Sequence, residues 1–206
     1  MTSTTPLRLT VFAGLLAAAA SAQASNAPVQ VLVQDSAGRP LADAVVFLES
    51  AEARAAVRPA REAVIAQVDK RFSPAVSVVP VGTAVQFPNR DTVRHHVYSF
   101  SAVKPFELKL YAGTPATPVV FDRAGIAVLG CNIHDNMTAW VVVVETPYFA
   151  RTAEGGRAAL DAVPPGAYRL RAWHAGLPVG APANDQPVQV VPGGNQFSVR
   201  FAPQPK

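Results

Sequence analysis

The residues best suited to chemistry lie in one short segment, residues 131–137 (CNIHDNM). The segment places the thiol of Cys131, the imidazole of His134 and the thioether of Met137 three positions apart. Sulfur ligands combined with imidazole suit copper, which alternates between a soft Cu(I) and a harder Cu(II). Two His and one Cys in a trigonal plane with a weak axial Met form a blue copper site. The segment therefore predicts one mononuclear type-1 copper ion.

The second imidazole of such a site must come from elsewhere in the chain, and His95 and His96 are the candidates. Neighbouring side chains of a strand point to opposite faces, so only one of the pair can reach the metal. Periodicity favours His96, because it is in phase with Tyr98 and Phe100, two bulky residues suited to a core. Periodicity alone leaves the choice open.

Two other uses of this segment are less consistent with its residue types. Zinc prefers four firm tetrahedral ligands and seldom takes a thioether, while a Cys–His pair is the enzymatic alternative. Neither gives Met137 a role, so we expect an electron-transfer site and not an enzyme. His174, in phase with Tyr168 and Leu170, is expected to be a partly buried structural residue.

The elements that must position these ligands are strands. Half of the residues are apolar, 16% are charged and 19 are proline. Short Val-rich alternating runs are common and long amphipathic helices are scarce, which predicts an all-β fold. Residues 29–35 and 42–48 flank a Ser-Ala-Gly-Arg-Pro turn, so we expect them to form a hairpin. Residues 51–61 are expected to be a linker or a short helix.

The strand pattern restarts near Glu62 and again after Pro147, which favours two small β-sandwiches. The run VLVQDSAGRPLADAVVFLE resembles the start of a carboxypeptidase-regulatory-like, immunoglobulin-like sandwich. Its expected continuation, ALDAVPPGAYRLRA, occurs only after residue 157. The resemblance implies an outer sandwich formed by residues 27–58 and 149–203, with a domain at residues 62–146 inserted in it or flanked by it.

Residues 63–145 resemble a cupredoxin, a Greek-key β-sandwich, and most closely amicyanin among the plastocyanin-like small blue copper proteins. Cys131-x-x-His134-x-x-Met137 has amicyanin's short ligand loop, and the closing MTAWVVVVE matches the final strand. Asn89 precedes His95 by the Asn-x₅-His spacing of the family, which implies that His95 is the first ligand. His96 stands where the family usually has Asn.

The prolines that usually precede the first ligand and lie inside the loop are replaced by Arg94, Ile133 and Asp135. The resemblance implies outer-sphere electron transfer, with His95, Cys131 and His134 around copper and Met137 in the axial position. Amicyanin itself links a quinoprotein dehydrogenase to a c-type cytochrome. A c-type cytochrome or a periplasmic dehydrogenase is therefore the expected kind of redox partner.

The N-terminal residues predict export to the periplasm. Arg8, the apolar run Leu9–Ala20 and Ala22-Gln23-Ala24 form a signal peptide pattern, with cleavage expected after Ala24. The run is too short to span a bilayer, so no stable membrane insertion is expected. The formal charge is +4, with no basic block interleaved with aromatics, which argues against nucleic acid and at most favours an acidic protein partner.

Two other functions remain open from the sequence. The protein could store or deliver copper without redox turnover, although storage proteins usually carry Met- or His-rich tracts and this chain has two Met and four His. The outer sandwich could bind a carbohydrate or a protein partner. In that sandwich Trp173 is the aromatic residue expected to be exposed.

Overall fold

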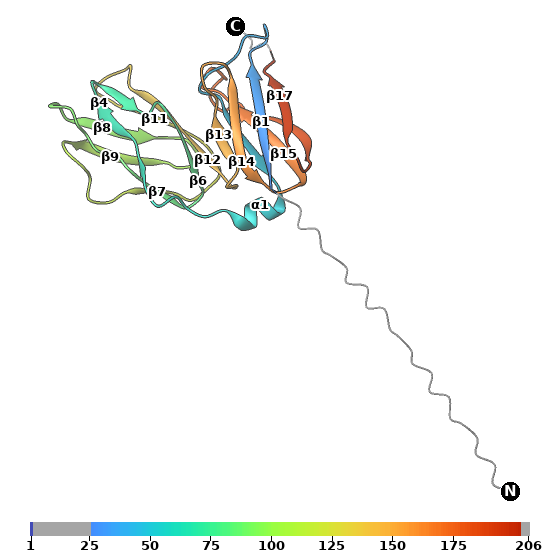
Figure 1. The fold of residues 1–206 in the computed structure, drawn as a ribbon. Helices are drawn as coiled ribbons and strands as arrows, with labels where there is room; N and C mark the ends of the chain where they lie inside the picture. The colour runs from blue at the N-terminus through green and yellow to red at the C-terminus, as the bar shows by residue number, and fades with distance from the viewer. Residues whose placement is uncertain (2–25, 203–206) are drawn as a thin grey trace.

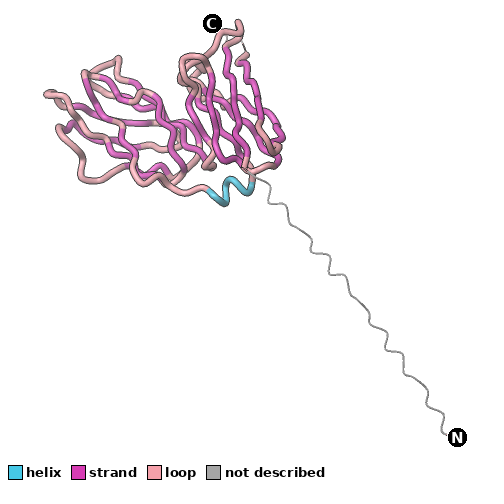
Figure 2. Tube along the Cα trace, in the orientation of Figure 1, coloured by secondary structure: helices cyan, strands magenta, loops and turns pink. Residues whose placement is uncertain are grey.

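The computed structural model describes Met1 and residues 26–202, and this part is almost entirely β-structure (Figure 2). The all-β prediction is confirmed. The predicted signal peptide lies, apart from Met1, outside the described residues. The strands are β1 (Ala27–Gln34), β2 (Val45–Glu49), β3 (Ala63–Val64), β4 (Ala66–Val68), β5 (Arg71–Ser73), β6 (Val76–Pro80), β7 (Thr83–Gln86), β8 (His95–Ser99), β9 (Phe106–Tyr111), β10 (Val119–Phe121), β11 (Gly125–Gly130), β12 (Thr138–Val144), β13 (Phe149–Arg151), β14 (Arg157–Val163), β15 (Gly166–Trp173), β16 (Asn184–Val190) and β17 (Asn195–Arg200).

A single short helix, α1 (Ala51–Ala56), occurs among the described residues. Ser50 caps it, because its hydroxyl accepts a hydrogen bond from the Ala53 amide at 3.1 Å. This matches the expected linker or short helix. No helix in residues 26–202 has the length and apolar composition needed to cross a membrane.

Strands from both ends of the described chain form the outer sandwich. One sheet has the order β14-β1-β17 and the other β13-β2-β15-β16. They enclose one apolar core, in which Val29, Val31 and Val33 of β1 pack with Leu48 of β2 and Leu170 of β15. The alternation of apolar and polar residues in β1 therefore arises because one face of the strand points into the core and the other points to solvent.

The predicted hairpin between residues 29–35 and 42–48 is wrong. β1 pairs antiparallel with β14 and parallel with β17, whereas β2 lies between β13 and β15 in the opposite sheet. Both runs carry an apolar face that must be buried. They bury it by facing each other across the core instead of pairing edge to edge.

The strands from residue 63 to residue 144 form the middle sandwich. Its larger sheet has the order β6-β12-β11-β8-β9, and it faces the three-stranded sheet β10-β7-β3, with the short pair β4-β5 at one end (Figure 1). Its core cluster includes Phe87, Phe121, Leu129, Cys131 and Met137. The cysteine and methionine singled out from the sequence are thus in one buried cluster.

The two sandwiches meet along β12 and β6 (Figure 1). Val141 and Val143 of β12 point into the middle core, while Val142 and Val144 pack with residues of the outer sandwich such as Phe47. This explains why residues 141–144 are all valine, since both faces of the strand are buried. An ion pair between Arg54 and Glu145 at 2.9 Å borders the contact.

Trp173 belongs to this junction. It is 3% exposed, and its ring lies 6.3 Å from that of Trp140, measured between centroids. The expectation that Trp173 is an exposed aromatic of the outer sandwich is therefore wrong. The reason is that β15 turns its last residue toward the middle sandwich and not toward solvent.

Candidate metal centre

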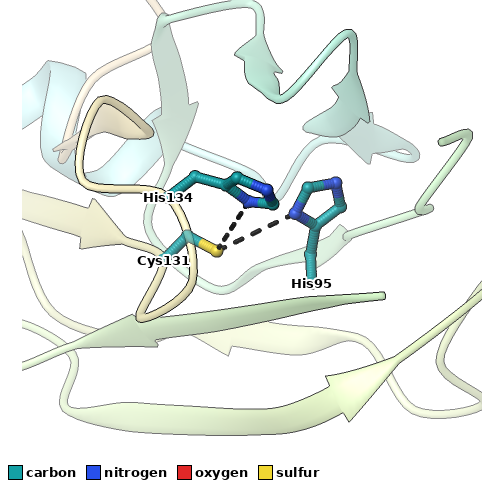
Figure 3. Close-up of side chains that lie close together, drawn as sticks. All are labelled: His95, Cys131 and His134. Atoms are coloured by element: carbon teal, nitrogen blue, oxygen red, sulfur yellow. Dashed lines mark hydrogen bonds between the residues drawn. The ribbon is translucent and has the colours of Figure 1, made fainter. Parts of the chain in front are cut away.

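Three side chains that carry possible metal ligands converge at one end of the middle sandwich. The ligand atoms of His95, Cys131 and His134 all lie within 4.8 Å of one another. Cys131 Sγ is 3.8 Å from His95 Nδ1 and 4.0 Å from His134 Nδ1, so both rings turn a nitrogen toward the sulfur (Figure 3). Three donors of different residues therefore face one small space.

Two neighbouring strands and one loop position these donors. His95 is the first residue of β8, and Cys131 follows directly after β11, which pairs with β8 through Gly130 and Tyr98. His134 lies in the loop between β11 and β12. The His134 carbonyl accepts a hydrogen bond from the Met137 amide at 3.0 Å, which closes the loop into a tight turn.

Met137, the predicted axial ligand, lies immediately before β12. It is 1% exposed and belongs to the same buried cluster as Cys131. Its backbone is tied to His134 by the hydrogen bond that closes the loop. An axial role for its sulfur is part of the proposal below.

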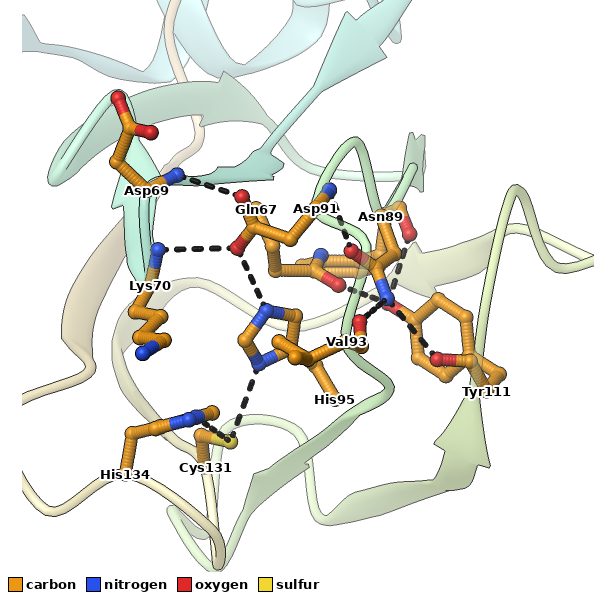
Figure 4. A network of polar contacts seen from close by, with 11 residues as sticks. Gln67, Asp69, Lys70, Asn89, Asp91, Val93, His95, Tyr111, Cys131 and His134 are labelled. Atoms are coloured by element: carbon orange, nitrogen blue, oxygen red, sulfur yellow. Dashed lines mark hydrogen bonds and ion pairs between the residues drawn. The ribbon is translucent and has the colours of Figure 1, made fainter.

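A carboxylate fixes the orientation of His95. Its Nε2 lies 2.7 Å from Asp91 Oδ2, so Nδ1 is the nitrogen directed at Cys131. The Asp91 carboxylate also accepts hydrogen bonds from the backbone amides of Asp69 at 2.7 Å and Lys70 at 2.9 Å (Figure 4). Burial alone would raise the pKa of Asp91, but these hydrogen bonds hold it below its usual value. An ionised carboxylate is thus kept against the ring.

A second group of hydrogen bonds holds the loop that carries Asp91. Asn89 Nδ2 donates to the carbonyls of Val93 at 2.8 Å and Tyr111 at 3.0 Å, and Asn89 Oδ1 accepts from the Asp91 amide at 2.9 Å. The Tyr111 hydroxyl contacts Gln67 Oε1 at 2.8 Å. Burial raises the pKa of Tyr111 to about 12, so this hydroxyl remains a donor at neutral pH.

His96 makes different contacts. Asn132 Nδ2 donates to His96 Nδ1 at 2.7 Å, and His96 Nε2 lies 2.9 Å from Glu107 Oε1, at ion-pair distance but outside hydrogen-bond geometry. His96 is not part of the group formed by His95, Cys131 and His134. The periodicity that favoured His96 is misleading here, because Phe100 in the same series is 84% exposed.

The donors present fit copper. A thiol and two imidazoles are the ligand types that copper prefers, and the group of three contains no carboxylate of the kind that calcium or magnesium would need. His95 and Cys131 are buried, while His134 is partly exposed. A metal bound here would be shielded on one side and close to solvent only at His134.

Sequence reasoning missed one residue that holds a member of this group and one that holds its neighbour His96. No role was assigned to Asp91 from the sequence, although a metal-binding histidine commonly has a supporting carboxylate and Asp91 is the acidic residue nearest before His95. No pattern in the sequence pointed to Asn132, because His96, whose ring it contacts, lies 36 positions away in the chain.

No family model matches this chain, and no curated protein matches it in sequence. Among solved structures, similarity was found to a copper-containing nitrite reductase from Thermus scotoductus SA-01, with 25% identity over 43% of this chain and a TM-score of 0.38. The match spans 23% of the nitrite reductase chain.

Two smaller proteins match over nearly their whole length. A purple cupredoxin from Nitrosopumilus maritimus is 23% identical over 40% of this chain and 99% of its own, with a TM-score of 0.36. A point mutant of amicyanin in its reduced Cu(I) form at pH 4 is 23% identical over 48% of this chain and 98% of its own, with a TM-score of 0.38.

Proposed function

We propose that this protein carries single electrons through one type-1 copper ion of the cupredoxin kind. His95 Nδ1, Cys131 Sγ and His134 Nδ1 would bind the ion, with the Met137 sulfur as a weak axial ligand. The observation that carries the proposal is the convergence of two imidazole nitrogens on the thiol within 4.8 Å. Bound copper would supply a one-electron Cu(II)/Cu(I) couple.

The residues around the group suit a carrier that keeps its geometry during electron transfer. Asp91 holds the His95 ring from behind, and the closed turn from His134 to Met137 limits movement of the loop. The buried cluster around Cys131 excludes water from the thiolate side. His134, as the partly exposed member, is the edge through which an electron would leave or enter.

The cellular location and the redox partner are part of the same proposal. The leader pattern of residues 1–24 supports export to the periplasm. An outer-sphere carrier needs a redox protein as partner, and a c-type cytochrome or a periplasmic dehydrogenase has the required chemistry. No substrate turnover is part of this function.

The decisive experiment is the visible spectrum of the protein loaded with Cu(II). Thiolate bound to Cu(II) in a trigonal site gives an intense charge-transfer band in the visible range, so the protein should be blue. Cys131→Ser should abolish the band, because an alkoxide or hydroxyl oxygen cannot replace the thiolate donor. The redox titration of the wild type should then show one electron per chain.

Ser99→Ala serves as the matched control, because Ser99 is equally buried but lies outside the group of three. It should keep the band. A colourless Cu(II) form of the wild type, or a stoichiometric preference for zinc over copper, would show that the proposal is wrong. Tight binding of Cu(I) without any reversible oxidation would instead indicate copper storage or delivery.

A further inference from the structure

Four cationic side chains lie in the two segments that border His95. Lys70 lies in the turn between β4 and β5 and Arg71 is the first residue of β5, while Arg90 and Arg94 belong to the loop before β8. All four are exposed. None of them forms an ion pair with any residue in the part of the chain that the structure describes. We call these four residues the cationic rim.

Half of the twelve cations that the structure describes outside the rim are neutralised by a neighbouring carboxylate. Six of them form ion pairs with carboxylates, namely Arg39, Arg54, Lys104, Arg151, Arg169 and Arg171. Their charge is therefore compensated within the chain. The charges of the cationic rim are directed to solvent and have no such compensation among the described residues.

The fold ties the two segments of the rim to the metal centre. The Asp91 carboxylate accepts hydrogen bonds from Asp69 and Lys70 amides and contacts His95 (Figure 4). The Arg90 amide also donates to the Gln67 carbonyl at 2.9 Å. Backbone hydrogen bonds thus hold both segments of the rim next to the residues that contact His95.

Exposed apolar side chains also lie close in the chain to the histidines of the group. Val93 is 40% exposed and Ile133 is 49% exposed, and each stands within two positions of a histidine of the group. Two exposed carboxylates, Asp69 and Asp135, oppose the four cations. The Asp91 side chain is only 12% exposed and its oxygens are already engaged. An apolar centre with a charged rim is the usual composition of a protein-binding surface.

We propose that this surface docks an acidic protein, one that carries carboxylates around its own redox centre. This partner class rests on the proposed function, since electron transfer is the reason for a protein to dock beside His134. Complementary charge would raise the rate of encounter and would orient the partner with its redox centre toward the site. Salt would weaken the effect, because the rim is exposed.

The first test needs no metal in the protein. Hexacyanochromate(III), an inert paramagnetic trianion, broadens the amide signals of the surface where anions collect. In copper-free protein at low salt, the amides of residues 69–71 and 90–94 should broaden before any others. Arg90→Glu combined with Arg94→Glu should remove this preference, whereas the control pair Arg157→Glu and Arg200→Glu in the outer sandwich should keep it.

Broadening that is uniform, or strongest at the outer sandwich, would overturn the proposal. The dispersion of the amide spectrum shows in the same experiment whether each variant is folded. If the Arg90 and Arg94 pair does not fold, Lys70→Glu with Arg71→Glu provides the second variant, with the same expected loss.

The second test uses the copper-loaded protein and small oxidants of opposite charge. Oxidation by hexacyanoferrate(III), which gains one electron as Cu(I) loses one, should slow about tenfold in the Arg90 and Arg94 variant at low salt. Oxidation by a cobalt(III) phenanthroline cation should speed up in that variant. Unchanged rates with both oxidants would count against the proposal.

A failed copper proposal is recognised separately from a failed docking proposal. The former appears as the absence of the blue band before any rate is measured. The latter appears in the broadening pattern, which does not depend on copper.

Discussion

Two adjacent histidines have different partners, and the partners explain their different roles. His95 is held by a carboxylate on one nitrogen and faces a thiol with the other. His96 instead links β8 to Asn132 of the ligand loop and approaches Glu107 of β9. His95 therefore has a nitrogen available for a metal, whereas both nitrogens of His96 are near other side chains.

Replacing each histidine by glycine separates these roles. His95→Gly should destroy the blue band, and added imidazole should restore it by filling the space left by the ring. His96→Gly should keep the band, because its nitrogens do not face Cys131. Visible spectra of both variants with and without imidazole give the answer. The reverse pattern would make His96 the ligand.

Asp91→Asn tests the carboxylate behind His95. The amide has nearly the same shape but no charge and only one acceptor oxygen, so it should still contact the ring but accept hydrogen bonds less effectively. Loss of a supporting partner of a metal-binding His typically lowers metal affinity by about 10–100-fold. Competition with a chelator should show this loss for copper.

Asp69→Asn is the matched control for that experiment. Only its backbone amide takes part in the network, and its side chain is exposed. Copper affinity in this variant should equal that of the wild type. Equal losses in the two variants would mean that Asp91 acts through general surface charge and not through His95.

At the scale of elements, Tyr111 ties β9 to β4 and to the residue that follows β7. Its hydroxyl contacts Gln67 Oε1 at 2.8 Å and the Phe87 carbonyl at 2.7 Å. Tyr111→Phe leaves these acceptors without their donor. A lost buried hydrogen bond of this kind costs about 1–3 kcal/mol in unfolding free energy. Urea unfolding at neutral pH should show it.

The pH dependence provides a second readout for the same variant. The folded pKa of Tyr111 is raised to about 12 from its ordinary value of 10.0, mainly by burial. A neutral phenol thus contributes stability that is fully present below about pH 10 and is lost as the pH rises through about 12. The wild type should lose this stability in that range, and Tyr111→Phe should lose less. Parallel losses in the two proteins would contradict the assignment.

The positions of strands and turns could be predicted from the sequence, because the alternation of apolar and polar residues and the turn-forming residues act locally. Their pairing could not. Val31 and Leu48 are both apolar residues of short runs joined by a turn, and nothing local distinguishes a hairpin from two strands that face each other across a core. Pairing depends on β14 and β17, which follow more than a hundred residues later.

More of the candidate site than of the strand pairing could be predicted from the sequence. Cys131 and His134 were found because a short loop brings its own residues together, and a local spacing is visible in a sequence. The choice between His95 and His96 needed the family register, since the phase with Tyr98 and Phe100 pointed the other way. Asp91 and Asn132 act through contacts that only the folded chain brings into reach.

At the scale of the whole molecule, we propose that the outer sandwich is one discontinuous domain and the middle sandwich a separate one. Among the strands that the structure describes, β1 pairs with β14 and β17, and β2 pairs with β13 and β15. All of these pairings join the two ends of the described chain. The middle strands likewise pair among themselves.

A chain ending at Glu145 tests this division. It lacks β14, β15 and β17, so residues 29–48 lose the partners of their apolar faces and should be cut rapidly by protease. The middle sandwich should stay folded and should still form the blue band. Protease resistance of residues 29–48 in the shortened chain would contradict a discontinuous outer domain.

The intrinsic tryptophan fluorescence of the protein also depends on the junction between the sandwiches. The chain has two tryptophans, and both lie at this contact, with ring centroids 6.3 Å apart. Tryptophan fluorescence therefore arises at the seam between the sandwiches and nowhere else in the molecule. Its wavelength and intensity report whether the sandwiches remain in contact or separate and admit water.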